Sequence, residues 1–82
     1  MSENELLGRI AIDPKVMLGK PAIRGTRLTV EYVLNLLAHG TAFEEILEEY
    51  EGLTLGDIQA CLLFATRSLE STDFMPLGSE TI

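Results

Sequence analysis

The residues best suited to binding chemistry lie in one basic stretch, KPAIRGTRLTV, at residues 20–30. Lys20, Arg24 and Arg27 are three of the 6 Lys and Arg residues in a chain whose net charge is -7. Cations at this density can neutralise phosphate groups, and Arg can bind a phosphate through two parallel hydrogen bonds. The same side chains can instead pair with the chain's own carboxylates, such as Glu31. The sequence leaves both interpretations open: a nucleic-acid-binding turn, or a turn that only supports the fold.

Catalytic and metal-binding residues are scarce. The chain has one His and one Cys, and neither a His-x-x-x-His nor a Cys-x-x-Cys spacing that would hold a metal ion. Gly19-Lys20 resembles the end of a phosphate loop, but Pro21 replaces the required Ser or Thr. No nucleophile, base and orienting group can be assembled within one chain. The sequence predicts a protein that is not an enzyme, with no catalytic residue, no metal site and no cofactor.

Acidic residues gather in the later part of the chain. Residues 1–27 contain five Lys or Arg and three Asp or Glu, whereas residues 28–82 contain one and ten. Such a division suggests two surfaces with different partners. Only the surface formed by residues 1–27 would attract phosphate. The densest acidic run, on one predicted helix, consists of Glu44, Glu45, Glu48 and Glu49. This ridge is either a solvated face or a docking face for a basic partner.

The first third of the chain has the pattern of a short β-hairpin, at about residues 9–29. RIAID places two Ile residues two positions apart, as in a short strand, and ends at Asp13-Pro14, a pair that starts turns. KVML is a candidate second strand. Gly25 can adopt the positive φ of a tight turn, so we expect the hairpin to turn there.

Three helices follow, each with apolar residues at helical spacing. Thr29 is a suitable N-cap for the first of them. Thr41 with Glu44, and Thr54 with Asp57, have the three-residue spacing of a capping box. The predicted helices cover about residues 30–39, 42–50 and 54–70.

The last predicted helix is apolar almost all round between Ala60 and Ala65. One neighbouring face cannot cover such a segment, so we expect a central core helix whose second face meets another subunit in a homodimer. The second and third helices, separated by a short break, have the outline of a helix-turn-helix. The predicted fold class is therefore mainly α: short N-terminal strands followed by a three-helix domain that is homeodomain-like or winged-helix-like.

In a helix-turn-helix the start of the second helix meets the nucleic acid. Thr54 and Gln59 are the residues there that can contact a base or a phosphate, and Asp57 would be repelled by the backbone. The basic turn would supply further phosphate contacts through Lys20, Arg24 and other cations. The outline alone is a weak argument for DNA binding, because many three-helix domains bind only proteins.

Residues 1–70 form one predicted domain, and residues 71–82 a C-terminal tail in which Pro76 and Gly78 interrupt any helical pattern. The tail is either a loosely packed end of the domain or a segment that binds a partner. Its candidate partner contacts are the apolar residues Phe74, Met75 and Leu77.

The sequence contains no predicted membrane segment or secretion signal. The longest unbroken apolar run, ACLLFA, is far too short to cross a bilayer, and MSENELLGRI lacks the apolar core of a signal peptide. Cys61, the single Cys, suits a buried thiol in a reducing compartment. We expect a soluble cytoplasmic protein that does not bind membranes.

Residues 10 to 65 resemble the domain-of-unknown-function family number 433. The resemblance is carried by an Ile-x-x-x-Pro segment followed by the motif G-K-P-x-I-x-G-T-R-x-x-V, and it covers most of the chain. The matching motif residues are Gly19, Lys20, Pro21, Ile23, Arg24, Gly25, Thr26, Arg27 and Val30.

This resemblance implies a small helix-turn-helix-like fold. As for many members, it also implies the role of an antitoxin that blocks a PIN-like ribonuclease toxin and can bind its own promoter DNA to repress its operon. It does not say which motif residues touch a partner. Two alternatives remain: a DNA-binding transcriptional regulator without a toxin, and a protein interaction or dimerisation module.

Overall fold

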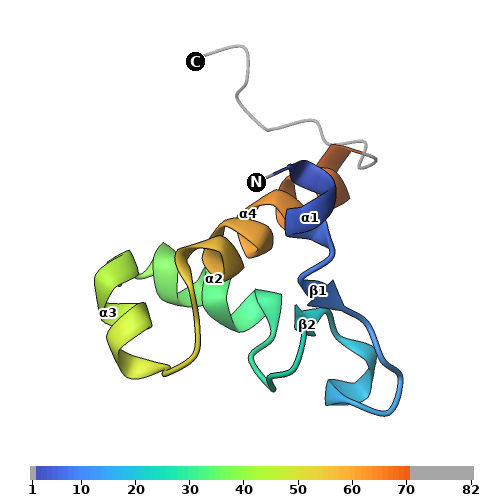
Figure 1. Cartoon of the computed structure of the whole chain (residues 1–82), viewed down its shortest axis with the longest axis horizontal. Coiled ribbons are helices and arrows are strands. Elements are labelled where there is room, and N and C mark those ends of the chain that lie inside the picture. Colours follow the sequence, from blue (N-terminus) through green and yellow to red (C-terminus); the bar gives the residue numbers. More distant parts are fainter. Residues whose placement is uncertain (1, 71–82) are drawn as a thin grey trace, which may run out of the picture.

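The computed structural model describes residues 2–70, over which the chain is mainly helical. Figure 1 shows α3 at one end of the molecule, α1 and the strands at the other, and α4 running between them. In chain order the elements are α1 (Glu3–Leu7), β1 (Ile10–Ala11), a 3₁₀ helix (Met17–Gly19), β2 (Ala22–Ile23), α2 (Val30–Ala38), α3 (Phe43–Glu49) and α4 (Leu55–Glu70). The predicted fold class, short strands followed by helices, is confirmed, with α1 as an additional helix.

β1 and β2 form a two-stranded antiparallel sheet in which Ile10 pairs with Ile23. The prediction of a second strand at KVML is wrong, because that segment forms a turn and the 3₁₀ helix. Met17 and Leu18 there adopt left-handed φ values of 51° and 56°. Such values are incompatible with a strand and are unfavourable for side chains with a Cβ atom.

Gly25 forms the expected tight turn, with a φ of 82°. The Thr26 hydroxyl donates to the Ile23 carbonyl at 2.7 Å and accepts from the Leu28 amide at 3.0 Å, so it satisfies two backbone groups of the turn. The chain then returns beside β2 through an isolated bridge at Thr29. The Gly25 turn therefore follows β2, and a longer loop containing the 3₁₀ helix connects the two strands.

Side-chain caps begin α2 and α4 as predicted. The Thr29 hydroxyl accepts from the Tyr32 amide at 3.0 Å. At α4 the Thr54 hydroxyl accepts from the Asp57 amide at 3.3 Å, and the Asp57 carboxylate accepts from the Thr54 amide at 2.9 Å. This reciprocal capping box satisfies amides that have no partner within the helix.

The predicted cap of α3 is wrong by one residue. Ala42, and not Thr41, is the N-cap residue, and Glu45, and not Glu44, accepts a hydrogen bond from the Ala42 amide at 2.8 Å. A run of adjacent carboxylates offers a suitable acceptor in either register. The observed register places Ile46 in the core, where it is 1% exposed.

No helix is expected before residue 9, and α1 corrects this expectation. The Ser2 hydroxyl accepts from the Glu5 amide at 3.1 Å, and the Glu5 carboxylate accepts from the Ser2 amide at 2.8 Å. These hydrogen bonds lower the pKa of Glu5. A helix this short is marginal in isolation. Packing of Leu6 against the core and of α1 against α4 stabilises it.

The core lies around the first half of α4. Its largest fully buried side chains are Ile23 from β2, Val33 from α2, Ile46 from α3, and Ile58 and Cys61 from α4. From Leu62 onward α4 is less well covered, since Leu62 and Leu69 remain 39% and 66% exposed. Within residues 2–70, the helices are too short or too polar to cross a membrane.

Burial raises the pKa of the Cys61 thiol to about 11. In the unfolded chain a thiol ionises near pH 8.5, so between about pH 8.5 and pH 11 the Cys61 thiol gains charge only in the unfolded state. We expect the free energy of unfolding to fall as the pH rises through this window. Urea unfolding of Cys61→Ala at the same pH values should show a shallower decline. Parallel declines in the two proteins would contradict a buried, neutral thiol.

Candidate functional site

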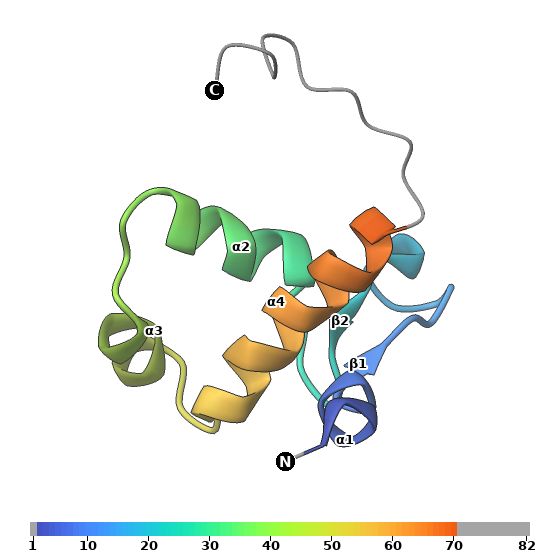
Figure 2. The ribbon, with the colours of Figure 1, turned by 90° about the horizontal axis from the view of Figure 1, so that it is seen from above.

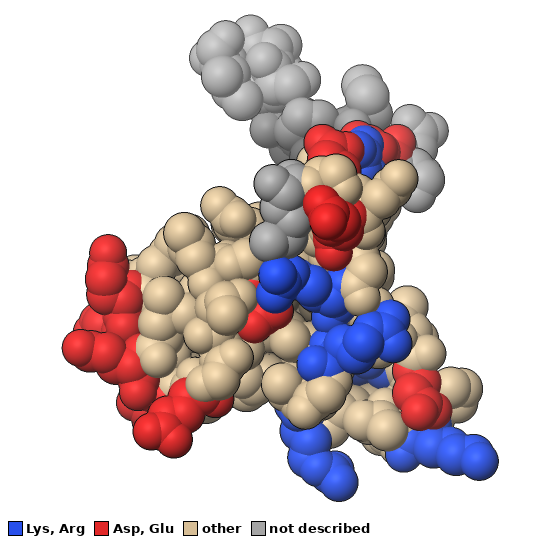
Figure 3. Space-filling model, viewed as in Figure 1, with Lys and Arg blue, Asp and Glu red and all other residues tan. Residues whose placement is uncertain are grey.

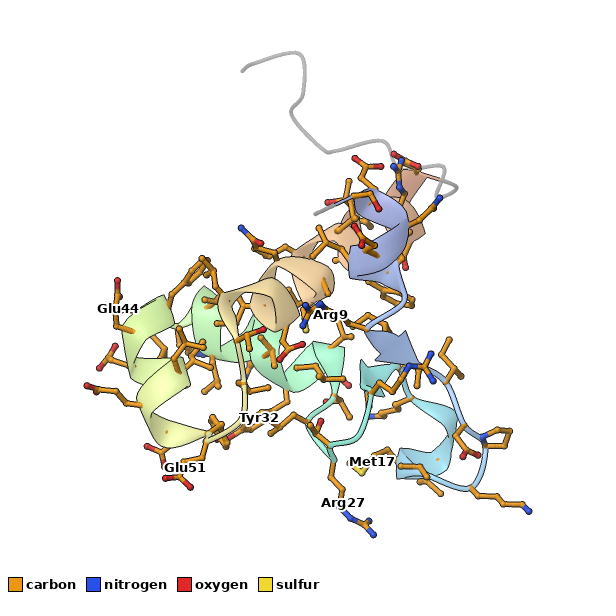
Figure 4. All side chains as sticks on the ribbon, in the orientation of Figure 1. Arg9, Met17, Arg27, Tyr32, Glu44 and Glu51 are labelled. Carbon is orange, nitrogen blue, oxygen red and sulfur yellow. The ribbon has the colours of Figure 1, made fainter. Side chains whose placement is uncertain are left out.

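The three basic side chains of the predicted binding turn have different roles. Lys20 Nζ donates to Glu31 Oε1 at 3.0 Å in a solvent-exposed pair. Arg24 Nε donates to the backbone carbonyl of Gly8 at 3.0 Å. Arg27 projects into solvent (Figure 4) and has no hydrogen bond or ion pair within residues 2–70. Of the three, only Arg27 is free of a protein partner.

Arg24 supports the fold as well as carrying charge. Its Nη2 lies 3.5 Å from the Ile10 carbonyl oxygen, and its amide donates to the Arg9 carbonyl at 2.7 Å. These contacts join the Gly25 turn to the segment between α1 and β1. Because a guanidinium has five N–H donors, Arg24 keeps donors for a further acceptor.

A pocket of about 530 Å³ lies between the Gly25 turn and the loop that connects the strands. Its lining includes Lys20, Arg24 and Arg27, together with the carboxylate-bearing Asp13. Figure 3 shows Lys and Arg side chains gathered over this end of the molecule. The balance of charge in the pocket favours an anion as its ligand.

A second charged cluster, which the sequence analysis misses, joins Arg9 to the start of α4. Arg9 Nη1 donates to Asp57 Oδ1 at 2.9 Å and to Thr54 Oγ1 at 3.3 Å. Figure 4 shows Arg9 reaching from the chain before β1 toward α4. Asp57 is only 8% exposed, so its carboxylate depends on this cation and on the Thr54 amide.

The two predicted DNA-contacting residues at the start of α4 differ in whether their side chains are already hydrogen-bonded. The Thr54 hydroxyl is engaged by Arg9 and by the Asp57 amide. Gln59 is exposed on α4. Its side chain has no hydrogen bond within the described part of the chain. Gln59 is therefore available to a partner, whereas the Thr54 hydroxyl serves the helix cap.

The predicted acidic ridge occupies the opposite end of the molecule from the basic pocket. Figure 3 shows carboxylates gathered over α3, at the far left of the view. Glu44, Glu48 and Glu49 are exposed and have no hydrogen bond or ion pair within residues 2–70. Glu45 caps the helix. We call Glu44, Glu48 and Glu49 the α3 carboxylates; they are free to meet a cationic partner.

A pair of tyrosines holds α3 against α2. The Tyr32 and Tyr50 hydroxyls lie 2.6 Å apart, and the two rings pack edge to face with centroids 6.1 Å apart. The hydrogen bond raises the pKa of Tyr50 to about 12, because it stabilises the protonated phenol. The pair positions the end of α3, and with it the α3 carboxylates.

The predicted tail contacts Phe74, Met75 and Leu77 lie outside the described residues. Among the residues that are described, no group of three or more His, Cys, Asp or Glu side chains is arranged to hold a metal ion. The candidate sites are therefore the basic pocket, the α3 carboxylates and the exposed Gln59.

The fold and these surfaces define a small, mainly helical protein with charged faces arranged at opposite ends. The pattern of the family described as "Protein of unknown function (DUF433)" matches residues 10–65. The chain belongs to the DUF433 family, in agreement with the resemblance carried by its G-K-P-x-I-x-G-T-R-x-x-V motif.

One similar solved structure is a DUF433 member protein from Anabaena variabilis. It shares 31% sequence identity with this chain, and the two structures superpose with a TM-score of 0.73. The match covers 82% of this chain and 66% of that chain. No curated protein matches this chain.

We expect Arg9→Ala to lower the free energy of unfolding by about 1–3 kcal/mol, because it removes the cation from a mostly buried carboxylate. Lys15→Ala is the control, since the Lys15 side chain has no partner within residues 2–70. That control should cost less than about 0.5 kcal/mol. Urea unfolding followed by circular dichroism measures both values. Equal losses in the two variants would show that the Arg9 to Asp57 pair does not stabilise the fold.

Proposed function

We propose that the protein is a non-enzymatic, antitoxin-type protein that forms a homodimer and blocks a PIN-like ribonuclease. The observation that best supports this is the placement of the α3 carboxylates at the end of the molecule away from the basic pocket (Figure 3). A ribonuclease must offer cations to the phosphates of RNA. A fixed ridge of carboxylates competes for those cations, so α3 fits the RNA-binding surface of such an enzyme.

The positions of the two potential catalytic groups support a binding role. His39 follows α2 at an exposed position, with Nδ1 2.8 Å from the Asn35 carbonyl oxygen. Cys61 is fully buried, and burial raises the pKa of its thiol. A nucleophile needs an accessible, activated thiolate with a base in reach. Neither side chain meets these requirements in the described structure.

The exposed Leu62 of α4 supports the proposed homodimer. Apolar side chains that remain exposed on a small domain are favoured at contacts between subunits. We place the dimer in the cytoplasm, where a reducing environment keeps Cys61 as a thiol.

Binding to the protein's own promoter DNA is a second candidate function, either beside toxin binding or as that of a regulator without a toxin. The pocket lined by Lys20, Arg24 and Arg27 favours it, because these cations can meet phosphates. The internal partners of Lys20, Arg24 and Thr54 leave Arg27 as the main free contact. A module that only dimerises or binds another protein is the remaining alternative.

We expect a tagged copy of the protein to capture a small ribonuclease from its native host. Glu44→Gln combined with Glu48→Gln and Glu49→Gln should then raise the Kd at least about tenfold at low salt, which corresponds to about 1.4 kcal/mol. Glu45 is left intact because it caps α3. Calorimetric titration with the purified ribonuclease measures the change.

The control for this experiment removes carboxylates from the opposite end of the molecule. Glu3→Gln with Glu70→Gln alters α1 and the end of α4, and the Kd should change less than about twofold. If the α3 variant bound as tightly as the unmodified protein, the ribonuclease would not be recognised by the α3 carboxylates.

For the DNA candidate, we expect a labelled fragment of the protein's own promoter to bind at low salt. In a dimer, Arg27→Ala should flatten the slope of log K against log salt by about 2. Each subunit loses one phosphate contact, and each contact contributes about 0.9 to the slope. Arg67→Ala, which alters a cation paired with Glu70, should leave the slope unchanged. Fluorescence anisotropy measures both slopes. No binding at low salt would exclude this candidate without affecting the ribonuclease proposal.

A further inference from the structure

A groove of about 970 Å³ lies between α2 and the second half of α4. Its apolar lining includes Val30 and Leu34 from α2, and Phe64, Ala65 and Leu69 from α4. Lys20 and Glu31 also line it, but they pair with each other at 3.0 Å. The groove therefore favours an apolar occupant over a charged one.

Two groove side chains are strongly exposed within the described structure. Leu69 is 66% exposed and Tyr32 is 43% exposed. Figure 2 shows the second half of α4 passing the start of α2. Burial of this apolar surface would be favourable, because it removes the side chains from water.

We propose that residues 71–82 of the same chain occupy this groove. α4 ends at Glu70, directly after the groove residue Leu69, so the segment is covalently attached one residue beyond the groove lining. An extended chain advances about 3.3 Å per residue, so residues 71–73 are long enough to turn back along the last helical turn, whose pitch is about 5.4 Å. The apolar residues that then enter the groove are Phe74, Met75 and Leu77.

The composition of the segment and its covalent attachment favour this occupant over a second copy. Phe74, Met75 and Leu77 place three apolar side chains within four positions, matching the apolar lining of the groove. Attachment to α4 gives the segment a high effective concentration, whereas a second copy must also lose translational freedom. The groove is lined without any residue of α3, so this proposal does not depend on the proposed ribonuclease binding.

A spin label near the end of the segment tests the proposal in the full chain. Ser79→Cys would carry a nitroxide, while Cys61, which is 0% exposed, stays unlabelled. We expect paramagnetic broadening of amide signals along the groove, at Asn35 and Ala65, and little at Glu48 on α3. Broadening that is weak and uniform over the whole domain would overturn the proposal.

A mixed sample separates the same chain from a second copy. Isotope-labelled protein without a spin label is combined with spin-labelled protein that carries no isotope label. Docking within one chain predicts no broadening of the groove signals in the mixture. Broadening at Asn35 and Ala65 in the mixture would assign the groove to a segment of another copy and overturn docking within one chain.

Two leucines of α4 provide matched variants for a second measurement. Leu69 lines the groove and Leu55 does not, although both are exposed. Leu69→Ser should speed chymotrypsin cleavage after Phe74 by about fivefold, because the docked segment loses apolar contact. Leu55→Ser should leave the rate unchanged. Equal rates in the two variants would overturn the proposal.

Discussion

The ion pair between Arg9 and Asp57 is the contact on which the arrangement of this domain depends. It joins the segment before β1 to the first turn of α4, two parts of the chain separated by 48 positions. Asp57 is almost buried, and a carboxylate in that position requires a cation and hydrogen-bond donors. The same turn of α4 leads directly into Ile58 and Cys61, around which the core is built. The strands and the helical end are thereby held as one body.

This body keeps unlike charges at opposite ends. At the strand end, much of the positive charge is used internally: Arg24 binds backbone carbonyls and Lys20 binds Glu31. At the other end, the α3 carboxylates have no internal partner within residues 2–70, while the pair of Tyr32 and Tyr50 fixes the end of their helix. An acidic face that is exposed and unpaired within residues 2–70 is suited to competing with RNA for a cationic surface. This physical property supports the antitoxin proposal more strongly than the basic turn supports DNA binding.

Much of the fold could be predicted because its signals are local. The caps of α2 and α4 and the turn at Gly25 depend on residues a few positions apart. The cap of α1 has the same signal, Ser2 three residues before Glu5, although no helix is predicted there. The left-handed backbone at Leu18 could not be predicted, because nothing in that residue type favours it. The pairing of Arg9 with Asp57 and the internal contacts of Arg24 depend on tertiary structure, so composition alone overestimates the basic surface.

The most direct test of the central claim is to map the partner's footprint on the protein. Amide chemical shifts of the isotope-labelled protein are recorded while a ribonuclease captured by the tagged protein from its native host is added. The account predicts the largest shifts along residues 43–49 of α3, and small shifts at residues 20–27. Shifts centred on residues 20–27, with α3 unaffected, would contradict the assignment of the acidic end to the ribonuclease.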